Sequence, residues 1–319
     1  MPTPLWDAFL AKVVPDEEVR AYLQRICGYS LTADISEHAL FFFYGLGGNG
    51  KGVFLNTLRA ILGDYASAAP AEMFMESQAQ RHPTEIARLA GRRLIVSQEI
   101  ERNQRWAESK INALTGGDPI VAHFMRQDDF EFYPQFKLAL AGNHKPSLRS
   151  VNQAIRRRLQ MIPFMVTIPD KERDRELKDK LKAEWPGILA SFVRGCLEWQ
   201  KDGLNPPKAV REATEAYLAE EDTVGRWIDD RCAVDKISTA YSAELYADWL
   251  WWCERVGERA SSQKSFGQSL LDREYRQTRD GTGQRQWIGI ALKPRPVNFY
   301  DFNRNPKPQR DDWGNKTCT

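Results

Sequence analysis

Residues 39–52 have the sequence ALFFFYGLGGNGKG, and this segment decides the fold. Its first part, residues 39–44, is a short apolar run whose length and aromatic content favour a buried strand over a helix. The glycine-rich part, residues 45–52, is followed by VFLNTLRAIL, in which apolar residues recur at helical spacing. Strand, glycine-rich loop and helix in this order are the setting of the P-loop, whose pattern is GxxxxGK[ST].

The chemistry of polyphosphate binding explains these residue types. Glycines let the backbone curl until successive N–H groups point at the phosphates, and the N-terminus of the next helix adds its positive dipole. Lys51 supplies a mobile positive charge for the β and γ phosphates. The predicted nucleotide-binding residues are Gly45, Leu46, Gly47, Gly48, Asn49, Gly50, Lys51, Gly52 and Val53.

One position departs from the P-loop pattern. Gly52 occupies the place of the Ser or Thr whose hydroxyl ligates Mg²⁺. We still expect ATP and Mg²⁺ as cofactors, because most phosphate contacts come from the backbone and from Lys51. Either water fills the place of the hydroxyl or Mg²⁺ binds more weakly, so hydrolysis is the step that the departure affects.

Two further apolar runs predict strands, and each leads into a polar residue suited to catalysis. Glu99 follows the run at residues 94–97 and is the candidate for binding the metal and polarising the attacking water. Asn143 follows the run at residues 137–142 and could either orient that water or sense the γ phosphate. Downstream lies Arg156-Arg157-Arg158, from which an arginine could reach the nucleotide of a neighbouring subunit.

The rest of the chain predicts helices and two hairpins. We expect a β-hairpin over residues 120–133, an aromatic-rich helix over 239–256 and a hairpin over 275–292 around Asp-Gly-Thr-Gly. The predicted domains are an N-terminal helical segment (1–38), an AAA+-like α/β core (39–168), a helical lid or connector (169–230), a winged-helix-like module (231–293) and a disordered tail (294–319).

Composition excludes several classes of protein. With 45 basic and 43 acidic residues the net charge is +2, so the chain is no polycation. Its five cysteines lie far apart without a CxxC pair, which argues against a disulfide framework and a structural zinc site. No apolar run is long enough to span a membrane, so we expect no membrane partner. These features predict a protein of a reducing compartment.

Several segments together resemble the superfamily 3 DNA helicases, in their phage and plasmid primase–helicase branch, including the poxvirus-type primase–helicase C-terminal region. The segments that carry the resemblance are YLQRICGYSLTADISEHALFFFYGLGGNGKG (22–52), RRLIVSQEIE (92–101), SKINALTGGDPIVAHFMRQDDFEFYPQFKLALAGNHKP (109–146) and AIRRRLQMIPF (154–164). The likeness extends over roughly residues 1–293.

The resemblance implies an ATP-dependent DNA helicase of phage or plasmid replication, acting in the bacterial host cytoplasm. In that family ATP is hydrolysed between the subunits of a ring, which implies a homo-hexamer that translocates on single-stranded DNA. The motifs of the family map onto Lys51, Glu99 and Asn143, and its trans-acting arginine maps onto Arg157 or Arg158. Its acidic motif spans Gln98-Glu99, with Gln98 where some relatives carry a second acid.

DNA contacts are expected at two places. The resemblance assigns a DNA-gripping hairpin to residues 120–133, with Lys110, His123 and Arg126 near the channel, although Asp128-Asp129 makes its tip acidic. The predicted winged-helix module has a basic face that includes Arg279 and Arg285. A solvated charged surface is the alternative interpretation of that face.

Two other functions remain open from the sequence. Because of Gly52, ATP could assemble a DNA-binding ring that hydrolyses poorly and serves as a loader or scaffold. A small-molecule P-loop kinase is the third candidate, although no acceptor pocket is recognisable. Relatives in the family often carry a primase–polymerase domain before the helicase, but this chain has no carboxylate cluster typical of a polymerase. We therefore expect no priming by this chain alone; a separate primase or polymerase, or a missing N-terminal part, would supply it.

Overall fold

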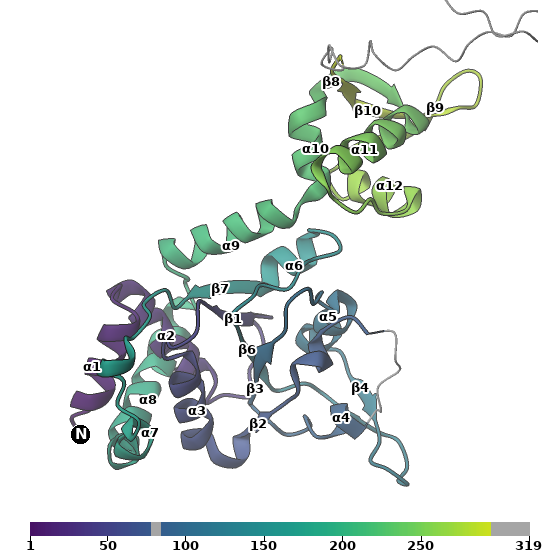
Figure 1. Cartoon of the computed structure of the whole chain (residues 1–319). Coiled ribbons are helices and arrows are strands. Elements are labelled where there is room, and N and C mark those ends of the chain that lie inside the picture. Colours follow the sequence, from purple (N-terminus) through teal and green to yellow (C-terminus); the bar gives the residue numbers. More distant parts are fainter. Residues whose placement is uncertain (78–83, 295–319) are drawn as a thin grey trace, which may run out of the picture. The chain divides into compact units, whose positions relative to one another are not determined.

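A computed structural model describes residues 1–77 and 84–294. The chain divides into two compact units, which meet in sequence between Asp222 and Thr223 (Figure 1). The predicted boundary after residue 230 is therefore too late, because the helix that spans residues 223–231 packs within the second unit. The predicted disordered tail lies, apart from Pro294, outside the described residues.

The first unit is a mixed α/β domain. Its helices are α1 (Pro4–Val13), α2 (Glu17–Tyr29), α3 (Lys51–Leu62), α4 (Thr84–Ala87), α5 (Glu108–Gly116), α6 (Gln153–Arg158), α7 (Leu177–Lys180), α8 (Trp185–Asp202) and α9 (Lys208–Glu221), with short 3-10 turns at Gly63–Tyr65, Ala71–Phe74, Asp170–Glu172 and Leu181–Glu184. Its strands are β1 (Leu40–Tyr44), β2 (Ala66–Ala68), β3 (Leu94–Ile100), β4 (Ile120–Ala122), β5 (Phe130–Phe132), β6 (Lys137–Gly142) and β7 (Leu159–Pro163).

A five-stranded parallel sheet in the order β2-β3-β6-β1-β7 forms the centre of this unit. The register pairs Leu40 of β1 with Leu138 of β6 on one side and with Leu159 of β7 on the other. The prediction of an α/β core with a central parallel sheet is confirmed. Because the carboxyl ends of parallel strands share one edge, the residues after β1, β3 and β6 gather there.

The aromatic run of β1 is buried on both faces of the sheet. Alternate side chains point to opposite faces, so Phe41 and Phe43 pack with Phe54 of α3 and with residues of α1, α2 and α8. The helices α1, α2, α3 and α8 cover that face of the sheet (Figure 1). Phe42 packs on the other face, where its ring meets Trp106 edge-on. Burial of each such side chain contributes about 1.5–3 kcal/mol, which fixes the strand that leads into the glycine-rich loop.

The predicted hairpin of residues 120–133 is present as β4 and β5, which pair antiparallel outside the main sheet. The ring of Phe124 in its loop stacks on that of Phe130, the first residue of β5, with the centroids 5.7 Å apart. Phe124 and Met125 at the tip remain exposed to 37% and 64%.

The second unit contains helices and a three-stranded antiparallel sheet. Its elements are α10 (Thr223–Arg231), β8 (Cys232–Tyr241), α11 (Ser242–Val256), α12 (Gln263–Leu271), β9 (Arg276–Arg279) and β10 (Arg285–Leu292), with strand order β8-β10-β9. The predicted hairpin is β9–β10. The predicted helix over 239–256 starts too early, because residues 239–241 pair with β10 as the end of β8.

Among the described residues of the second unit, four tryptophans, Trp227, Trp249, Trp252 and Trp287, belong to its core rather than to an exposed stacking surface. Trp227, Trp249 and Trp287 are each at most 2% exposed. A buried ion pair lies beside them, in which Arg231 and Asp248 are joined by two hydrogen bonds of 3.1 and 3.0 Å.

Candidate nucleotide-binding site

The glycine-rich loop joins β1 to α3 at the carboxyl edge of the sheet. At Gly45 a Cβ atom would lie 2.0 Å from the carbonyl oxygen of Phe164, so no other residue fits there. Gly50 has a φ of 85°, a left-handed conformation that favours glycine, and it immediately precedes the first turn of α3. The loop thus has the tight curvature that the P-loop pattern predicts.

Lys51, the first residue of α3, is buried with its ammonium group inside the loop. Its Nζ donates to the carbonyl of Gly45 at 2.7 Å and to the side-chain oxygens of Asn49 at 3.1 Å and Asn143 at 3.3 Å. Lys51 is only 7% exposed, and this burial lowers the pKa of its ammonium group to about 8. All of these acceptors are neutral, so the site holds a buried cation that a phosphate would neutralise.

The N-terminus of α3 adds a second feature suited to anions. No side chain caps this helix at Gly50, which leaves the first N–H groups of a twelve-residue helix available. Together with the positive end of the helix dipole and the Lys51 ammonium, these groups fit the phosphates of a nucleotide.

Asn143, predicted as a polar residue after the third strand, lies at the Lys51 ammonium. It follows β6, which pairs with β1, so the sheet brings two residues together that are 92 positions apart in sequence. Asn49, which the sequence predicts only as a nucleotide-binding residue, also braces the loop: it is 2% exposed, and its side-chain amide donates to the carbonyl of Phe164 at 2.7 Å.

The acidic residues expected at the metal lie at the end of β3. Pairing between β3 and β6 is irregular between Ser97 and Ile100, and Glu99 there is exposed with a φ of 67°. Such a left-handed conformation costs energy in a non-glycine residue and is concentrated at functional sites. No structural contact joins Glu99 to Lys51 in the described part of the chain, so its role stays a prediction.

The fit to Mg²⁺ is less complete than the fit to phosphate. Gly52 offers no side-chain oxygen, and the nearest atom to a Cβ built there is Oε1 of Gln98, at 3.4 Å. Residues 1–77 and 84–294 contain no group of three or more His, Cys, Asp or Glu that could hold a metal ion. A magnesium ion would therefore depend chiefly on nucleotide oxygens, with Gln98 and Glu99 as the nearest protein candidates.

The three consecutive arginines lie away from the loop of their own chain. They end α6 and directly precede β7, which runs parallel to β1. They therefore lie near the amino end of β7, whereas the glycine-rich loop lies at the carboxyl end of the sheet, about 16 Å away along the strand. Arg156 is paired with Glu215 at 3.0 Å, and Arg158 donates to the hydroxyl of Thr115 at 2.9 Å. Burial, followed by the charge of Arg157, lowers the pKa of Arg158. Arg157 is exposed and donates only to the carbonyl of Gln153 among the described contacts.

A further arginine, which the sequence did not single out, lies against the loop. The guanidinium of Arg173 is the closest group to a Cβ built at Gly48, and the amide of Ile168 donates to the carbonyl of Gly48 at 2.9 Å. Arg173 is itself held by the carbonyl of Ile168 at 2.9 Å and by Asp170 at 2.5 Å. Its place within a run of alternating charges gave no signal for this role.

The residues predicted to contact DNA occupy three different settings. His123 lies 2.9 Å from Asp129 within the hairpin, while Arg126 is exposed in the loop with a φ of 62°. Lys110 is half-buried on α5. In the second unit, Arg279 and Arg285 are exposed and directly opposite each other in the β9–β10 pair.

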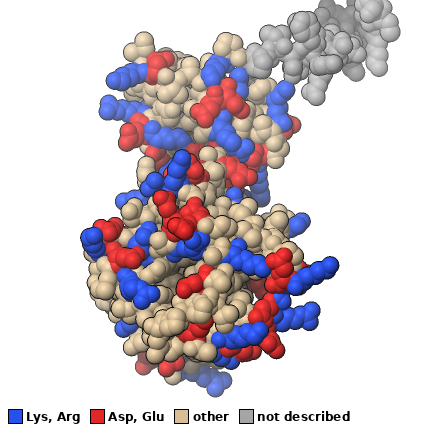
Figure 2. Space-filling model, turned by 90° about the vertical axis from the view of Figure 1, so that its left-hand side faces the viewer, with Lys and Arg blue, Asp and Glu red and all other residues tan. Residues whose placement is uncertain are grey.

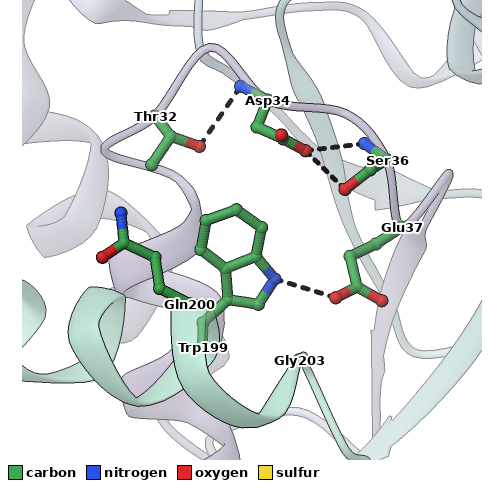
Figure 3. Close-up of a pocket in the computed structure, with 7 residues that line it drawn as sticks. All are labelled: Thr32, Asp34, Ser36, Glu37, Trp199, Gln200 and Gly203. Atoms are coloured by element: carbon green, nitrogen blue, oxygen red, sulfur yellow. Dashed lines mark hydrogen bonds between the residues drawn. The ribbon is translucent and has the colours of Figure 1, made fainter.

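The surface charges are mixed in sign. Figure 2 shows Lys and Arg interspersed with Asp and Glu over the visible face of both units. A pocket of about 520 Å³ lies elsewhere in the first unit, between residues 32–37 and the end of α8 (Figure 3). The indole of Trp199 donates there to Glu37 at 2.8 Å, and Asp34 accepts from Ser36. Thr32 in its lining binds Lys137 at the amino end of β6, so this pocket is at the opposite edge of the sheet from the loop.

Fold and site together define a P-loop-like α/β core. Residues 43–158 match the model of a family described as one of unknown function, DUF5906. The apo structure of the NrS-1 C-terminal region has a TM-score of 0.54 at 10% identity, over 91% of this chain and 76% of that one, and thus has a similar fold. In the described residues, no helix has both the length and the apolar character needed to cross a membrane.

Relatives in large DNA viruses are similar in sequence. A protein of Acanthamoeba polyphaga mimivirus is 27% identical over 267 residues, which are 77% of this chain and 28% of that protein. A protein of Frog virus 3 (isolate Goorha) is 26% identical over 314 residues, which are 89% of this chain and 31% of that protein. Each carries the name "Putative helicase", and this chain spans less than a third of either.

Proposed function

We propose that this chain is the motor of an ATP-dependent DNA helicase of the superfamily 3 type. The observation that carries the proposal is the Lys51 ammonium, buried at the head of an uncapped helix among neutral oxygens only. Similarity to viral proteins that carry the name "Putative helicase" supports a motor that uses ATP hydrolysis to move along DNA.

The positions of the arginines support a site shared between subunits. Arg157 is exposed near the edge of the sheet opposite the loop, so it cannot serve the nucleotide of its own chain without a large rearrangement. In a ring, the same residue would face the nucleotide of the next subunit. We therefore propose a ring, a homo-hexamer by family resemblance, in which Lys51 and Asn143 hold the triphosphate and Arg157 completes the site in trans.

DNA would be gripped by the hairpin and by the second unit. The element order helix, strand, helix, helix, strand, strand in residues 223–292 supports a winged-helix module. Contacts to phosphates make such binding salt-dependent and tolerant of sequence. A separate primase or polymerase remains the proposed partner.

The first experiment compares ATP hydrolysis by the wild type and Lys51→Ala, with and without single-stranded DNA. We expect DNA to stimulate the wild type and the variant to lose turnover, because the charge on the β and γ phosphates is no longer neutralised. Equal turnover of ATP by the wild type and Lys51→Ala would reject the proposal that this chain is an ATP-hydrolysing enzyme. Stimulation by DNA would exclude a small-molecule kinase.

A DNA-binding ring with weak hydrolysis is the second candidate, and Gly52 favours it. If the missing hydroxyl limits turnover, Gly52→Ser will raise hydrolysis or the affinity for Mg²⁺ markedly. If turnover does not change, the loader or scaffold interpretation loses its basis.

A further inference from the structure

Gly52 and Gln98 lie against each other across the metal side of the loop. Among the described residues, and apart from the chain neighbours of Gly52 and the backbone of its own helix, one atom comes within 4 Å of a Cβ built at Gly52. That atom is the side-chain oxygen Oε1 of Gln98, at 3.4 Å. The space in which a P-loop Ser or Thr would place its hydroxyl is thus next to an oxygen that β3 supplies.

The orientation of the Gln98 side chain is set by α3. Its Nε2 donates to Oδ1 of Asn56 at 3.3 Å, and Asn56 lies one helical turn after Gly52. Because the amide nitrogen is engaged by Asn56, the amide oxygen faces Gly52. The irregular end of β3 gives the two neighbouring residues different surroundings, with Gln98 half-buried and Glu99 exposed.

The chemistry of the site makes a neutral oxygen useful here. Mg²⁺ takes oxygen ligands and commonly keeps several waters besides the phosphate oxygens of the nucleotide. A carboxamide oxygen can complete that shell without placing another negative charge beside the triphosphate. Gln98 and Gly52 are then complementary departures from the P-loop pattern, since one supplies the oxygen that the other lacks.

We propose that the side-chain oxygen of Gln98 replaces the missing P-loop hydroxyl as the protein's contact to the divalent cation of the bound nucleotide. This inference rests on the proposed nucleotide site and adds the group that holds the metal there. Asn56 is the positioning residue that keeps the amide turned toward Gly52.

The test measures how strongly Mg²⁺ tightens ATP binding. The affinity for a fluorescent ATP analogue is determined in EDTA and in Mg²⁺ for the wild type, Gln98→Ala, Gly52→Ser and the double variant. We expect Gln98→Ala to keep its affinity in EDTA and to lose about tenfold of the Mg²⁺ enhancement, as for other groups that support a metal. Gln200→Ala, an exposed residue of the distant pocket, is the matched control and should behave as wild type.

The second substitution distinguishes a metal contact from a structural role. If Gln98 supplies the missing oxygen, Gly52→Ser will restore the Mg²⁺ enhancement in the Gln98→Ala background. Asn56→Asp, which keeps an acceptor for Nε2, should retain the enhancement, whereas Asn56→Ala should reduce it.

Two outcomes would overturn the inference. One is an unchanged Mg²⁺ enhancement in Gln98→Ala, and the other is a loss that Gly52→Ser fails to restore. With either result, the proposed nucleotide-binding site remains supported as long as the protein binds ATP in EDTA. Absence of ATP binding by the wild type in both conditions would instead reject the proposed function itself.

Discussion

The ammonium of Lys51 lies 3.3 Å from the side-chain oxygen of Asn143, so the ends of two neighbouring strands share one cation. Lys51 begins the helix after β1, and Asn143 directly follows β6. The pairing of β1 with β6 holds Lys51 and Asn143 together. A change in the charge around Lys51 therefore acts directly on Asn143, the residue that we expect to orient the attacking water. Nucleotide binding would replace neutral oxygens around Lys51 by charged phosphate oxygens.

The affinity for ATP should therefore fall in alkaline solution. Burial lowers the pKa of Lys51 to about 8, and only the protonated form attracts phosphate. Above pH 8, Lys51 is mostly neutral in the free protein and must take up a proton before it can hold the phosphates. We therefore expect the affinity for ATP to drop by up to about tenfold per pH unit. The drop ends where pH exceeds the pKa of Lys51 in the complex, which phosphate raises. Fluorescence titration between pH 7 and 9.5 measures this.

Lys51→Ala is the control for that pH profile. It has no proton to recover, so its weaker binding should not show the same decline above pH 8. A wild-type affinity that stays level to pH 9.5 would contradict either the lowered pKa of Lys51 or its contact with the phosphates. Weaker binding by Lys51→Ala at pH 7 would then show that the contact exists and that the pKa is not lowered.

Among the three consecutive arginines, Arg157 should matter most for turnover. We expect Arg157→Ala to lower DNA-stimulated hydrolysis by about 10³-fold, the usual effect of a trans-acting arginine, with little change in ATP affinity. Arg156→Ala is the matched control, because Arg156 is already paired with Glu215 at 3.0 Å. Steady-state hydrolysis and analogue binding are measured on the same preparations.

Mixing subunits tests whether this arginine acts in trans. Lys51→Ala subunits keep Arg157, and Arg157→Ala subunits keep Lys51, so a mixed ring contains some complete sites. Partial recovery of hydrolysis on mixing is expected. If the mixture is as inactive as its two components, Arg157 does not complete a neighbour's site.

The order of elements around the loop was predictable because strong local signals coincide there. The apolar run of residues 39–44, the glycines and the following helical pattern agree with one another, and the structure confirms the strand, the loop and α3. The same holds for the hairpins at residues 120–133 and 275–292, in which alternating segments flank the polar residues 126–129 and the sequence Asp-Gly-Thr-Gly at 280–283.

What sequence reasoning missed depends on contacts between distant segments. Nothing local to Arg173 shows that its guanidinium lies against Gly48, and nothing local to Gln98 shows that it faces Gly52. The start of α11 was misplaced for a similar reason: Thr239 to Tyr241 fit a helical pattern, yet they pair with β10, and pairing prevails over weak propensity.

The paired arginines of the second unit should have opposite effects on stability and on DNA binding. Arg279 and Arg285 are directly opposite in the β9–β10 pair, and like charges in that position destabilise a sheet. We expect Arg279→Gln to leave the free energy of unfolding unchanged or to raise it by up to about 1 kcal/mol. If the pair contacts DNA phosphates, the same variant should bind DNA more weakly, with a salt slope smaller by about one.

DNA binding by the variant is measured by fluorescence anisotropy at several salt concentrations. Arg255→Gln is a suitable control, since Arg255 lies on α11 over the ring of Trp251, 4.9 Å from its centroid. Unchanged affinity and salt slope in Arg279→Gln would support the alternative, a charged surface that does not contact DNA.

Lys137 should make the stability of the first unit depend on pH. It begins β6, is 2% exposed, and donates to the carbonyl of Thr32 at 2.6 Å. Burial lowers the pKa of Lys137 to about 7, whereas an unfolded lysine titrates near pH 10.4. Between these values the unfolded chain binds more protons than the folded one, so this lysine makes the free energy of unfolding rise with pH.

Lys137→Met isolates that contribution because it removes the titrating group and keeps most of the side-chain volume. Urea unfolding of both proteins at pH 7, 8 and 9 gives their difference in free energy, from which other titrating groups such as Lys51 cancel. We expect the wild type to gain relative to the variant by up to about 1.4 kcal/mol per pH unit across this range. A difference that stays constant with pH would show that Lys137 keeps its proton in the folded state, in which case its contacts to Thr32 and to the ring of Tyr29, 4.3 Å away, outweigh its burial.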